Sequence, residues 1–255
     1  MHDQQQAVTT DCDADPKGYV SSYVGETAVG YSFRVRRERL LEMLGEGNGE
    51  VLDIGCGPGV MTAEILARGW RWTGIDIAPK MIETTLERFG ADARVKALVG
   101  GVEQIPTESN RFEVVIAMGL VEYLPDDATV VREMARVLKP GGRLFVSLPN
   151  WWSPVRMWDR WIIRPLATAA RIFGRRGGRA GVYSAEYRPA EYRALLAREG
   201  LEPLRTIAYN MRLLPRPFDF WFPRLSVRIA TVLEKIHRGP LWWLATGVIV
   251  EAKKR

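Results

Sequence analysis

The 255-residue chain is long enough to bury one large core and short for two separate domains. Hydrophobic residues make up 47% and charged residues 26%, as in globular proteins, and the polar, acidic start lacks the order of a signal peptide, so we expect a cytoplasmic location. The longest apolar run, 241–250, is too short for a transmembrane helix, and two cysteines with two histidines are too few for a disulfide framework or a common metal site.

Helical and strand patterns alternate along most of the chain. A helix is predicted over 31–44, and the helices at 61–67, 80–89 and 129–138 are each preceded and followed by predicted strands. The expected strands are 51–54, 72–77, 95–99, 112–118, 143–148, 204–209 and 247–252, and a last helix covers 186–199. This order predicts an α/β fold with a doubly wound, mostly parallel, seven-stranded sheet that binds ligands at the carboxyl ends of its strands.

Two segments, 151–185 and 210–241, do not fit the alternation, and we interpret them as helical insertions that form a lid. The remaining chain divides into a flexible start (1–30), a core (31–150) and two segments that complete the sheet (186–209 and 242–255). Charge divides the chain in the same place. Residues 1–150 carry 16 basic and 22 acidic side chains, a net −6, whereas 151–255 carry 20 and 8, a net +12, with seven of the nine tryptophans.

A glycine loop joins the strand at 51–54 to the following helix. Gly55, Gly57 and Gly59 can take positive φ and admit a ligand against the backbone, next to the free amides of the helix start. The spacing is one residue shorter than in a dinucleotide fingerprint, G-x-G-x-x-G. Asp76 ends the next strand, where a carboxylate can accept hydrogen bonds from both hydroxyls of a ribose.

Three stretches carry a family resemblance. Val51-Leu52-Asp53-Ile54-Gly55-Cys56-Gly57-Pro58-Gly59 resembles the first motif of class I S-adenosylmethionine-dependent methyltransferases. Gly74-Ile75-Asp76, with Met81 five residues on, is similar to their second motif, and Leu138-Lys139-Pro140-Gly141-Gly142 to a late one. The resemblance covers about 35–150 and is nearest to the small-molecule branch that includes ubiquinone and menaquinone methyltransferases. It implies S-adenosyl-L-methionine as cofactor and S-adenosyl-L-homocysteine as product.

The resemblance also implies roles for individual residues. The three glycines would line the methionine part of the cofactor, Asp53 would lie near its amino group and Asp76 would hold the ribose. One position departs from the family, because Gly101 stands where an aspartate binds adenine, which leaves Val102 or Glu103 as candidates. The full expected cofactor set is Asp53, Gly55, Cys56, Gly57, Gly59, Asp76, Ile77, Met81, Val102, Glu103 and Met118.

A general base is optional for methyl transfer, because positioning and desolvation can supply much of the rate. An acceptor that must lose a proton needs one. The candidates are Glu122 and Tyr123, which follow the strand at 112–118, and His237 in the second insertion. Glu122 as a helix-start acid, Tyr123 as a core aromatic and His237 as a non-catalytic residue remain alternatives.

The insertions combine arginine with aromatic residues. Val155, Trp158, Trp161 and Ile162 share one face of a predicted helix, with arginines around the other. A lid with solvated arginines, contact with a membrane or lipid-like substrate, and nucleic-acid binding are three interpretations. We expect methyl transfer to oxygen or carbon of a small, largely apolar acceptor, possible peripheral contact at the inner membrane face, and no nucleic acid. A nucleic-acid methyltransferase and a non-catalytic cofactor-binding protein are the rivals.

Overall fold

The computed structural model describes residues 18, 20–21, 27–172, 184–236 and 239–255. A seven-stranded sheet in the order β3-β2-β1-β4-β5-β7-β6 forms its centre. The strands are β1 Glu50–Ile54, β2 Arg71–Asp76, β3 Val95–Val99, β4 Phe112–Ala117, β5 Leu138–Pro149, β6 Leu201–Tyr209 and β7 Gly247–Lys254. All neighbours pair in parallel except β7, which is antiparallel to both β5 and β6. The predicted doubly wound, mostly parallel seven-stranded sheet is confirmed.

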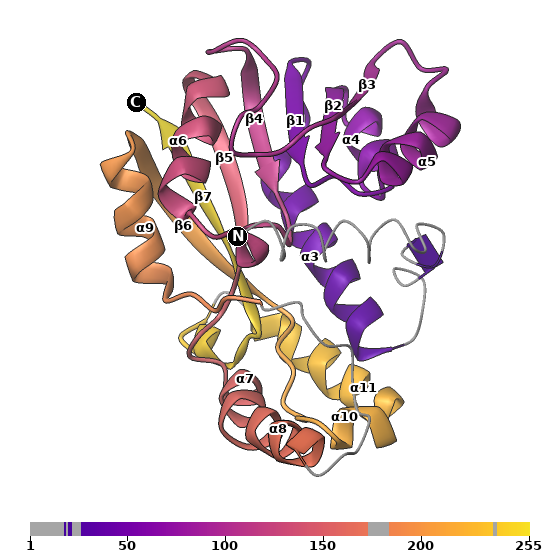
Figure 1. Cartoon of the computed structure of the whole chain (residues 1–255), viewed down its shortest axis with the longest axis vertical. Helices are drawn as coiled ribbons and strands as arrows, with labels where there is room; N and C mark the ends of the chain where they lie inside the picture. Colours follow the sequence, from indigo (N-terminus) through magenta and orange to yellow (C-terminus); the bar gives the residue numbers. More distant parts are fainter. Residues whose placement is uncertain (1–17, 19, 22–26, 173–183, 237–238) are drawn as a thin grey trace.

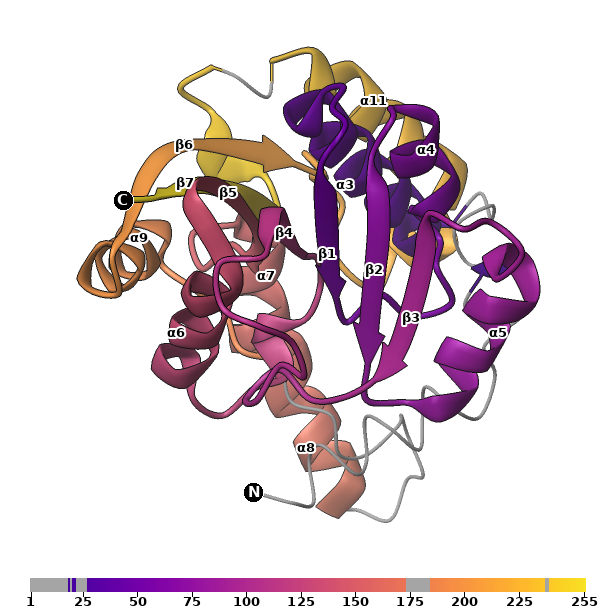
Figure 2. The same ribbon diagram turned by 90° about the horizontal axis from the view of Figure 1, so that it is seen from above.

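Helices cover both faces of the sheet (Figure 2). One face packs against α3 (Ala28–Leu44), α4 (Thr62–Ala67) and α5 (Pro79–Phe89), where Leu40, Trp72 and Phe145 are fully buried. The other packs against α6 (Asp127–Val137) and α9 (Pro189–Arg198), where Met134 and Leu196 are fully buried. The central strands are therefore apolar on both sides, as the continuous run in 112–118 predicts.

The observed elements differ from the predicted ones mainly at one strand. β5 begins at Leu138, five residues before the predicted strand, because Phe112 pairs with Leu138 across a register shift that absorbs Pro140-Gly141-Gly142. Gly141 has φ of 77°, a left-handed conformation that favours glycine, so the stretch is a bulged strand start and not only a turn. The other predicted elements are present, with ends shifted by a few residues.

The first predicted insertion follows the carboxyl end of β5 (Figure 1) and meets the second where Trp158 Nε1 donates to Arg216 O. The longest helix of the second insertion packs against α3, away from the first (Figure 2). The first contains α7 (Pro154–Trp158), a π-helical turn η2 (Asp159–Ile163) and α8 (Arg164–Ile172). The second contains α10 (Phe218–Trp221), α11 (Pro223–Leu233) and the turn η3 (Glu234–Ile236), and η4 (Trp242–Leu244) follows it. We call these helices the lid. Among the described residues, no helix is both long and apolar enough to cross a membrane.

The first lid helices show the reverse of the usual amphipathic arrangement. Arg160 and Arg164 hydrogen-bond the Glu186 carboxylate, and Arg156 lies 3.9 Å from it. The Glu186 side chain is only 4% exposed. Val155 is buried, but Trp158, Trp161 and Ile162, expected on the same face, are exposed, with Trp161 at 67%. The predicted burial of Trp158, Trp161 and Ile162 is therefore wrong, because these helices turn Arg156, Arg160 and Arg164 toward Glu186. The side chains of Arg171, Arg175, Arg176 and Arg179 lie outside the described part of the chain.

We expect Glu186→Ala to loosen the lid, because it leaves the partly buried Arg160 guanidinium without its carboxylate. Since the arginines are only partly buried, the free energy of unfolding should fall by about 1–3 kcal/mol in urea denaturation. Glu191→Ala is the control, because the exposed Arg188–Glu191 pair should contribute less than about 0.5 kcal/mol. Equal destabilisation by the two variants would contradict a special role for Glu186.

Candidate functional site

The glycine loop crosses the carboxyl end of β1 in a conformation that requires glycine. Gly55, Gly57 and Gly59 have φ of 69°, 53° and 66°. A Cβ at Gly55 would lie 3.1 Å from the Leu120 side chain, and one at Gly59 would lie 2.9 Å from Thr62 Oγ1. Side chains at these positions would therefore meet strain as well as neighbours. The loop keeps its backbone bare where a ligand can approach it.

Asp76, at the end of β2, holds this loop in place. Its Oδ2 accepts a hydrogen bond from Gly57 N at 2.8 Å, and its Oδ1 accepts one from Ala78 N at 2.9 Å. Each carboxylate oxygen can accept more than one hydrogen bond, and the residue is half-buried. The same carboxylate can thus fix the loop and still accept hydrogen bonds from a ligand.

Asp53 lies under the loop and is almost completely buried. Trp72 Nε1 donates to its Oδ2 at 3.4 Å. Burial raises the pKa of Asp53 to about 7, and the nearby Asp76 adds to the rise, while Trp72 and Arg36 oppose it. A buried carboxyl of this kind gains most from a cationic ligand group, because such a group supplies the missing counter-charge.

Cys56 is packed beneath the loop. A Cβ at Gly74 would lie 2.8 Å from its Sγ, which itself lies 3.5 Å from Gly57 O. Burial raises the pKa of the Cys56 thiol well above its ordinary value, and the charges of Asp53 and Asp76 add to the effect. The thiol is therefore an inert packing group and not a nucleophile.

The expected adenine side of the site begins at the end of β3. Val102 is buried in the core, so its side chain belongs to the sheet packing. A Cβ at Gly101 would lie 3.0 Å from Glu103 Oε2, which places the Glu103 carboxylate directly beside the Gly101 backbone. Ile77 is 40% exposed next to Asp76, whereas Met81 is buried below it. Ile77 and Glu103 are thus the accessible members of the predicted set here.

The end of β4 carries a buried charged cluster. Glu122 lies in the short helix η1 (Val121–Tyr123) and is buried, and its Oε2 has no hydrogen-bond partner. Burial raises the pKa of Glu122, and the positive charges of Arg36 and Arg156 partly offset the rise. Tyr209 shares this environment, and its pKa is also raised by burial. Tyr123 is half-buried, and Met118 is buried in the core.

Arg36 connects this cluster to the glycine loop, and the sequence did not single it out. It is buried in α3, and a Cβ at Gly119 would lie 2.5 Å from its Nη1. Its charge acts on Asp53 on one side and on Glu122 and Tyr209 on the other. In the sequence it stands among Arg34, Arg37 and Arg39, so only its position on the inner helix face could have distinguished it.

His237, the third predicted base, lies outside the described residues. Among 27–172, 184–236 and 239–255 there is no cluster of three or more potential metal ligands. The candidate site therefore consists of the glycine loop, Asp53, Asp76, Ile77 and Glu103 on one side, and Arg36 and Glu122 with Tyr209 on the other.

Comparisons with known proteins agree with this geometry. Residues 51–142 match the model of a family described as "Methyltransferase domain". The chain is 34% identical over 118 residues to "Ubiquinone biosynthesis O-methyltransferase" of Xanthomonas oryzae pv. oryzae, covering 46% of this chain and 49% of the relative. The protein of the same name from Bordetella avium is 32% identical over 183 residues, 69% of this chain and 73% of the relative. The chain thus spans about half the length of the Xanthomonas relatives it matches.

Solved structures show the same fold. A methyltransferase from Thermotoga maritima superposes with a TM-score of 0.65 at 15% identity, covering 95% of this chain and 97% of that one. A Haemonchus contortus phosphoethanolamine N-methyltransferase, solved with phosphomonomethylethanolamine and S-adenosylhomocysteine, gives a TM-score of 0.56 at 16% identity, covering 86% and 52%. At these identities the likeness concerns the fold.

Proposed function

Since the chain belongs to the class I S-adenosylmethionine-dependent methyltransferases, we propose that it transfers the methyl group of S-adenosyl-L-methionine to oxygen or carbon of a small, largely apolar acceptor. The observation that carries the proposal is the buried Glu122 carboxylate, with an unpartnered Oε2, on the acceptor side of a complete glycine-loop site. The names of the relatives, ubiquinone biosynthesis O-methyltransferases, support oxygen as the methylated atom.

The residues at the loop fit the three parts of the cofactor. Asp76, a half-buried carboxylate at the end of β2, is placed to bind the ribose hydroxyls, and the bare backbone at Gly55 and Gly57 admits the methionine part. Asp53 supplies a negative charge for the amino group, and Arg36, a buried cation near Asp53, supplies a positive charge for the carboxylate. The opposite charges at this end match an amino-acid zwitterion.

The adenine end is held differently from the family pattern. We propose that Ile77 packs on the ring and that the Glu103 carboxylate, beside the Gly101 backbone, accepts from the adenine amino group. An aspartate at position 101 would place a second carboxylate against Glu103 and would be repelled by it. Glu103, with the small Gly101 beside it, thus takes the role that the family gives to an aspartate at position 101.

The pKa of Asp53 predicts how cofactor binding depends on pH. The carboxyl is mostly protonated at pH 6 and mostly ionised at pH 8, and only the ionised form pairs with an amino group. Affinity for S-adenosylhomocysteine should therefore fall by about tenfold from pH 8 to pH 6 in calorimetric titration, relative to Asp53→Asn. The ionisable groups of the ligand affect the parent and the variant equally, so the difference between the two pH profiles reports on Asp53. Parallel pH profiles for the two proteins would contradict the assignment.

The same raised pKa has a consequence for stability. The unfolded chain has an Asp53 pKa near its ordinary value, so the folded form binds the proton more tightly. This contribution to stability is present at low pH and is lost as the pH rises from about 4 through about 7. A ligand ammonium at Asp53 would offset that loss, which couples cofactor binding to the fold.

Glu122 is our proposed base for proton removal from the acceptor. Bound S-adenosylmethionine supplies a methyl group on a positively charged sulfur. Glu122 Oε2 would take the proton from the acceptor oxygen as that oxygen becomes methylated. A pKa raised by burial makes Glu122 a better proton acceptor than an exposed glutamate. The positive charges of Arg36 and Arg156 favour the ionised form of Glu122, which is the form that can accept a proton.

We expect Glu122→Gln to lower turnover by about 10²-fold or more while cofactor affinity stays unchanged. The parent rate should rise with pH through a pKa above the ordinary glutamate value, and the variant should lack that step. Turnover is measured as isotope-labelled methyl transfer into lipid and polar extracts, followed by mass spectrometry. Tyr123→Phe is the control. A parent that binds the cofactor but labels no acceptor would contradict the enzymatic function, and an unchanged Glu122→Gln would contradict only the base.

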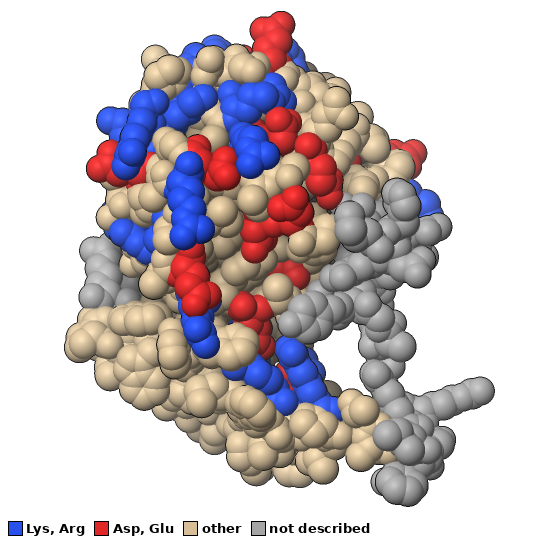
Figure 3. Space-filling model, turned by 60° about the vertical axis from the view of Figure 1, so that its left-hand side comes forward, with Lys and Arg blue, Asp and Glu red and all other residues tan. Residues whose placement is uncertain are grey.

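The outer surface of the lid supports a second part of the proposal, peripheral membrane contact. Phe220 is 81% exposed, and Trp161, Leu166 and Trp221 are each more than 60% exposed. The lid end is almost free of charge on the side seen in Figure 3, and its basic residues lie at the junction with the core. Arg216, Arg224 and Arg228 are exposed in the second lid segment. Exposed aromatics with arginines nearby are typical of an interfacial surface that meets anionic lipid.

We expect Trp161→Ser with Phe220→Ser to weaken co-sedimentation with phosphatidylglycerol vesicles by at least tenfold, because burial of each side chain contributes about 1.5–3 kcal/mol. Leu204→Ser, an equally apolar change at an exposed position of β6, should leave it unchanged. If the parent does not sediment with the vesicles, the membrane proposal fails and the methyl-transfer proposal stands.

A further inference from the structure

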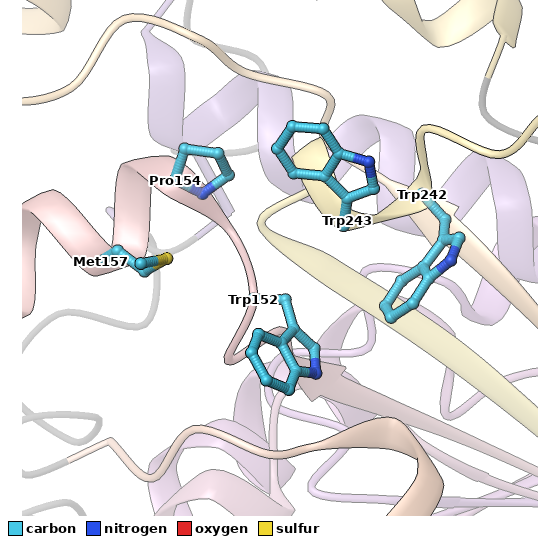
Figure 4. A pocket seen from close by; sticks show the side chains of 5 residues that line it. All are labelled: Trp152, Pro154, Met157, Trp242 and Trp243. Carbon is cyan, nitrogen blue, oxygen red and sulfur yellow. The ribbon is translucent and has the colours of Figure 1, made fainter.

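An open aromatic cleft lies between the first lid helix and the turn before β7. Its volume is about 360 Å³, and its lining consists of Trp152, Pro154, Met157, Trp242 and Trp243 (Figure 4). Trp152 is 48% exposed, and Trp242 and Trp243 are 39% and 42% exposed. Three tryptophans left half open to solvent around one cleft form a surface that gains stability when an apolar group covers it.

The cleft is connected to the acceptor side of the site through a short chain of contacts. Trp151 N donates to Tyr187 O at 2.9 Å, and the Tyr187 hydroxyl donates to Val121 O at 2.9 Å, next to Glu122. On the other wall, Asn150 Nδ2 donates to Ala245 O at 2.9 Å, which ties the start of the lid to the end of η4. These bonds hold both walls of the cleft in a fixed position relative to η1.

Helix α7 contributes side chains to both the charged cluster and the cleft. Arg156 donates to Thr246 O at 2.6 Å, and its charge acts on Glu122 and Tyr209, so this side chain faces the candidate site. The next residue, Met157, lines the cleft. The same turn of α7 therefore presents the polar Arg156 to Glu122 and the apolar Met157 to the cleft.

The chemistry of the cleft favours a hydrocarbon over a cation. Tryptophan cages do bind quaternary ammonium groups, but they do so where the surroundings are neutral or negative. Here the Arg188 guanidinium lies 5.8 Å from the Trp152 ring, and Arg156 belongs to the adjoining helix. No carboxylate lines the cleft. A positive ligand would find no carboxylate in the lining, and the nearby Glu191 and Glu186 already pair with Arg188 and Arg156.

We propose that this cleft is the binding subsite for the hydrocarbon chain of the acceptor, whose reactive oxygen or carbon lies at Glu122. The inference rests on the proposed function and makes it more specific. The acceptor has a polar reactive head and a linear alkyl or prenyl chain. The head lies on the Arg156 side of α7, next to Glu122, and the chain extends along Met157 and the tryptophans. A volume of about 360 Å³ is at the lower end of the range for small-molecule sites, which suits a single chain.

The test uses 12-bromododecanol as probe, because bromine quenches the fluorescence of tryptophans that it touches. The full chain is titrated without cofactor and without vesicles, so the result does not depend on methyl transfer. We expect saturable quenching by ω-bromoalkanols, with affinity rising by up to about fourfold per methylene from six to twelve carbons. Choline is the competitor for the alternative ligand class. Displacement of the probe by choline, or affinity that does not depend on chain length, would overturn the proposal.

Matched variants locate the binding. Met157→Gln puts a polar group into the cleft at a position that is already 42% exposed, so we expect the fold to persist and probe affinity to fall by at least fivefold. Trp242→Ser should have a larger effect. Trp161→Ser and Leu166→Gln alter apolar side chains of the lid that are more exposed and lie outside the cleft lining, and they should leave affinity within twofold. Equal losses from the two sets would mean binding to the outer lid surface and would overturn the proposal.

Discussion

The Asp76 carboxylate is the interaction on which the site depends. It joins the end of β2 to the glycine loop through Gly57 N and to the start of α5 through Ala78 N. The loop also bonds to Ile75 O through Gly55 N and Cys56 N, but Asp76 is the side chain that fixes Gly57, where glycine would otherwise allow many backbone conformations. A group that binds the ligand also maintains the shape of the loop, so loss of affinity and loss of local order are coupled at this residue.

A second carboxylate, Glu186, whose side chain is buried, fixes the position of the first lid helices. It lies outside the first insertion and pairs with arginines from α7, η2 and α8. Three positive charges turned toward one negative charge leave the opposite side of these helices to tryptophan and leucine. The polarity of the lid is thus set by its attachment to the core. The attachment also leaves the apolar cleft between α7 and η4 open.

The sequence predicted most of the core because strand and helix periodicities are local. It identified Asp53, Asp76 and the glycines for the same reason, since all lie in short motifs. It could not identify Arg36, because four arginines share one helix and only packing distinguishes the buried one. It also could not orient Trp158 and Trp161, because the face that a helix buries depended on Glu186, more than twenty residues away. The substitution at Gly101 was visible, but its relation to Glu103 required the backbone geometry.

The position of β7 affects the order in which the protein is built. It is the last strand in sequence, yet it lies between β5 and β6 and bonds to both. Lys254 then donates to Ala135 O and Leu138 O, across the bulged start of β5. During synthesis from the amino end, β6 can pack against α3 and α9, but it has no strand to pair with until residues 247–254 are available. The hydrogen bonds of the sheet edge at β6 therefore depend on the last strand to be synthesised.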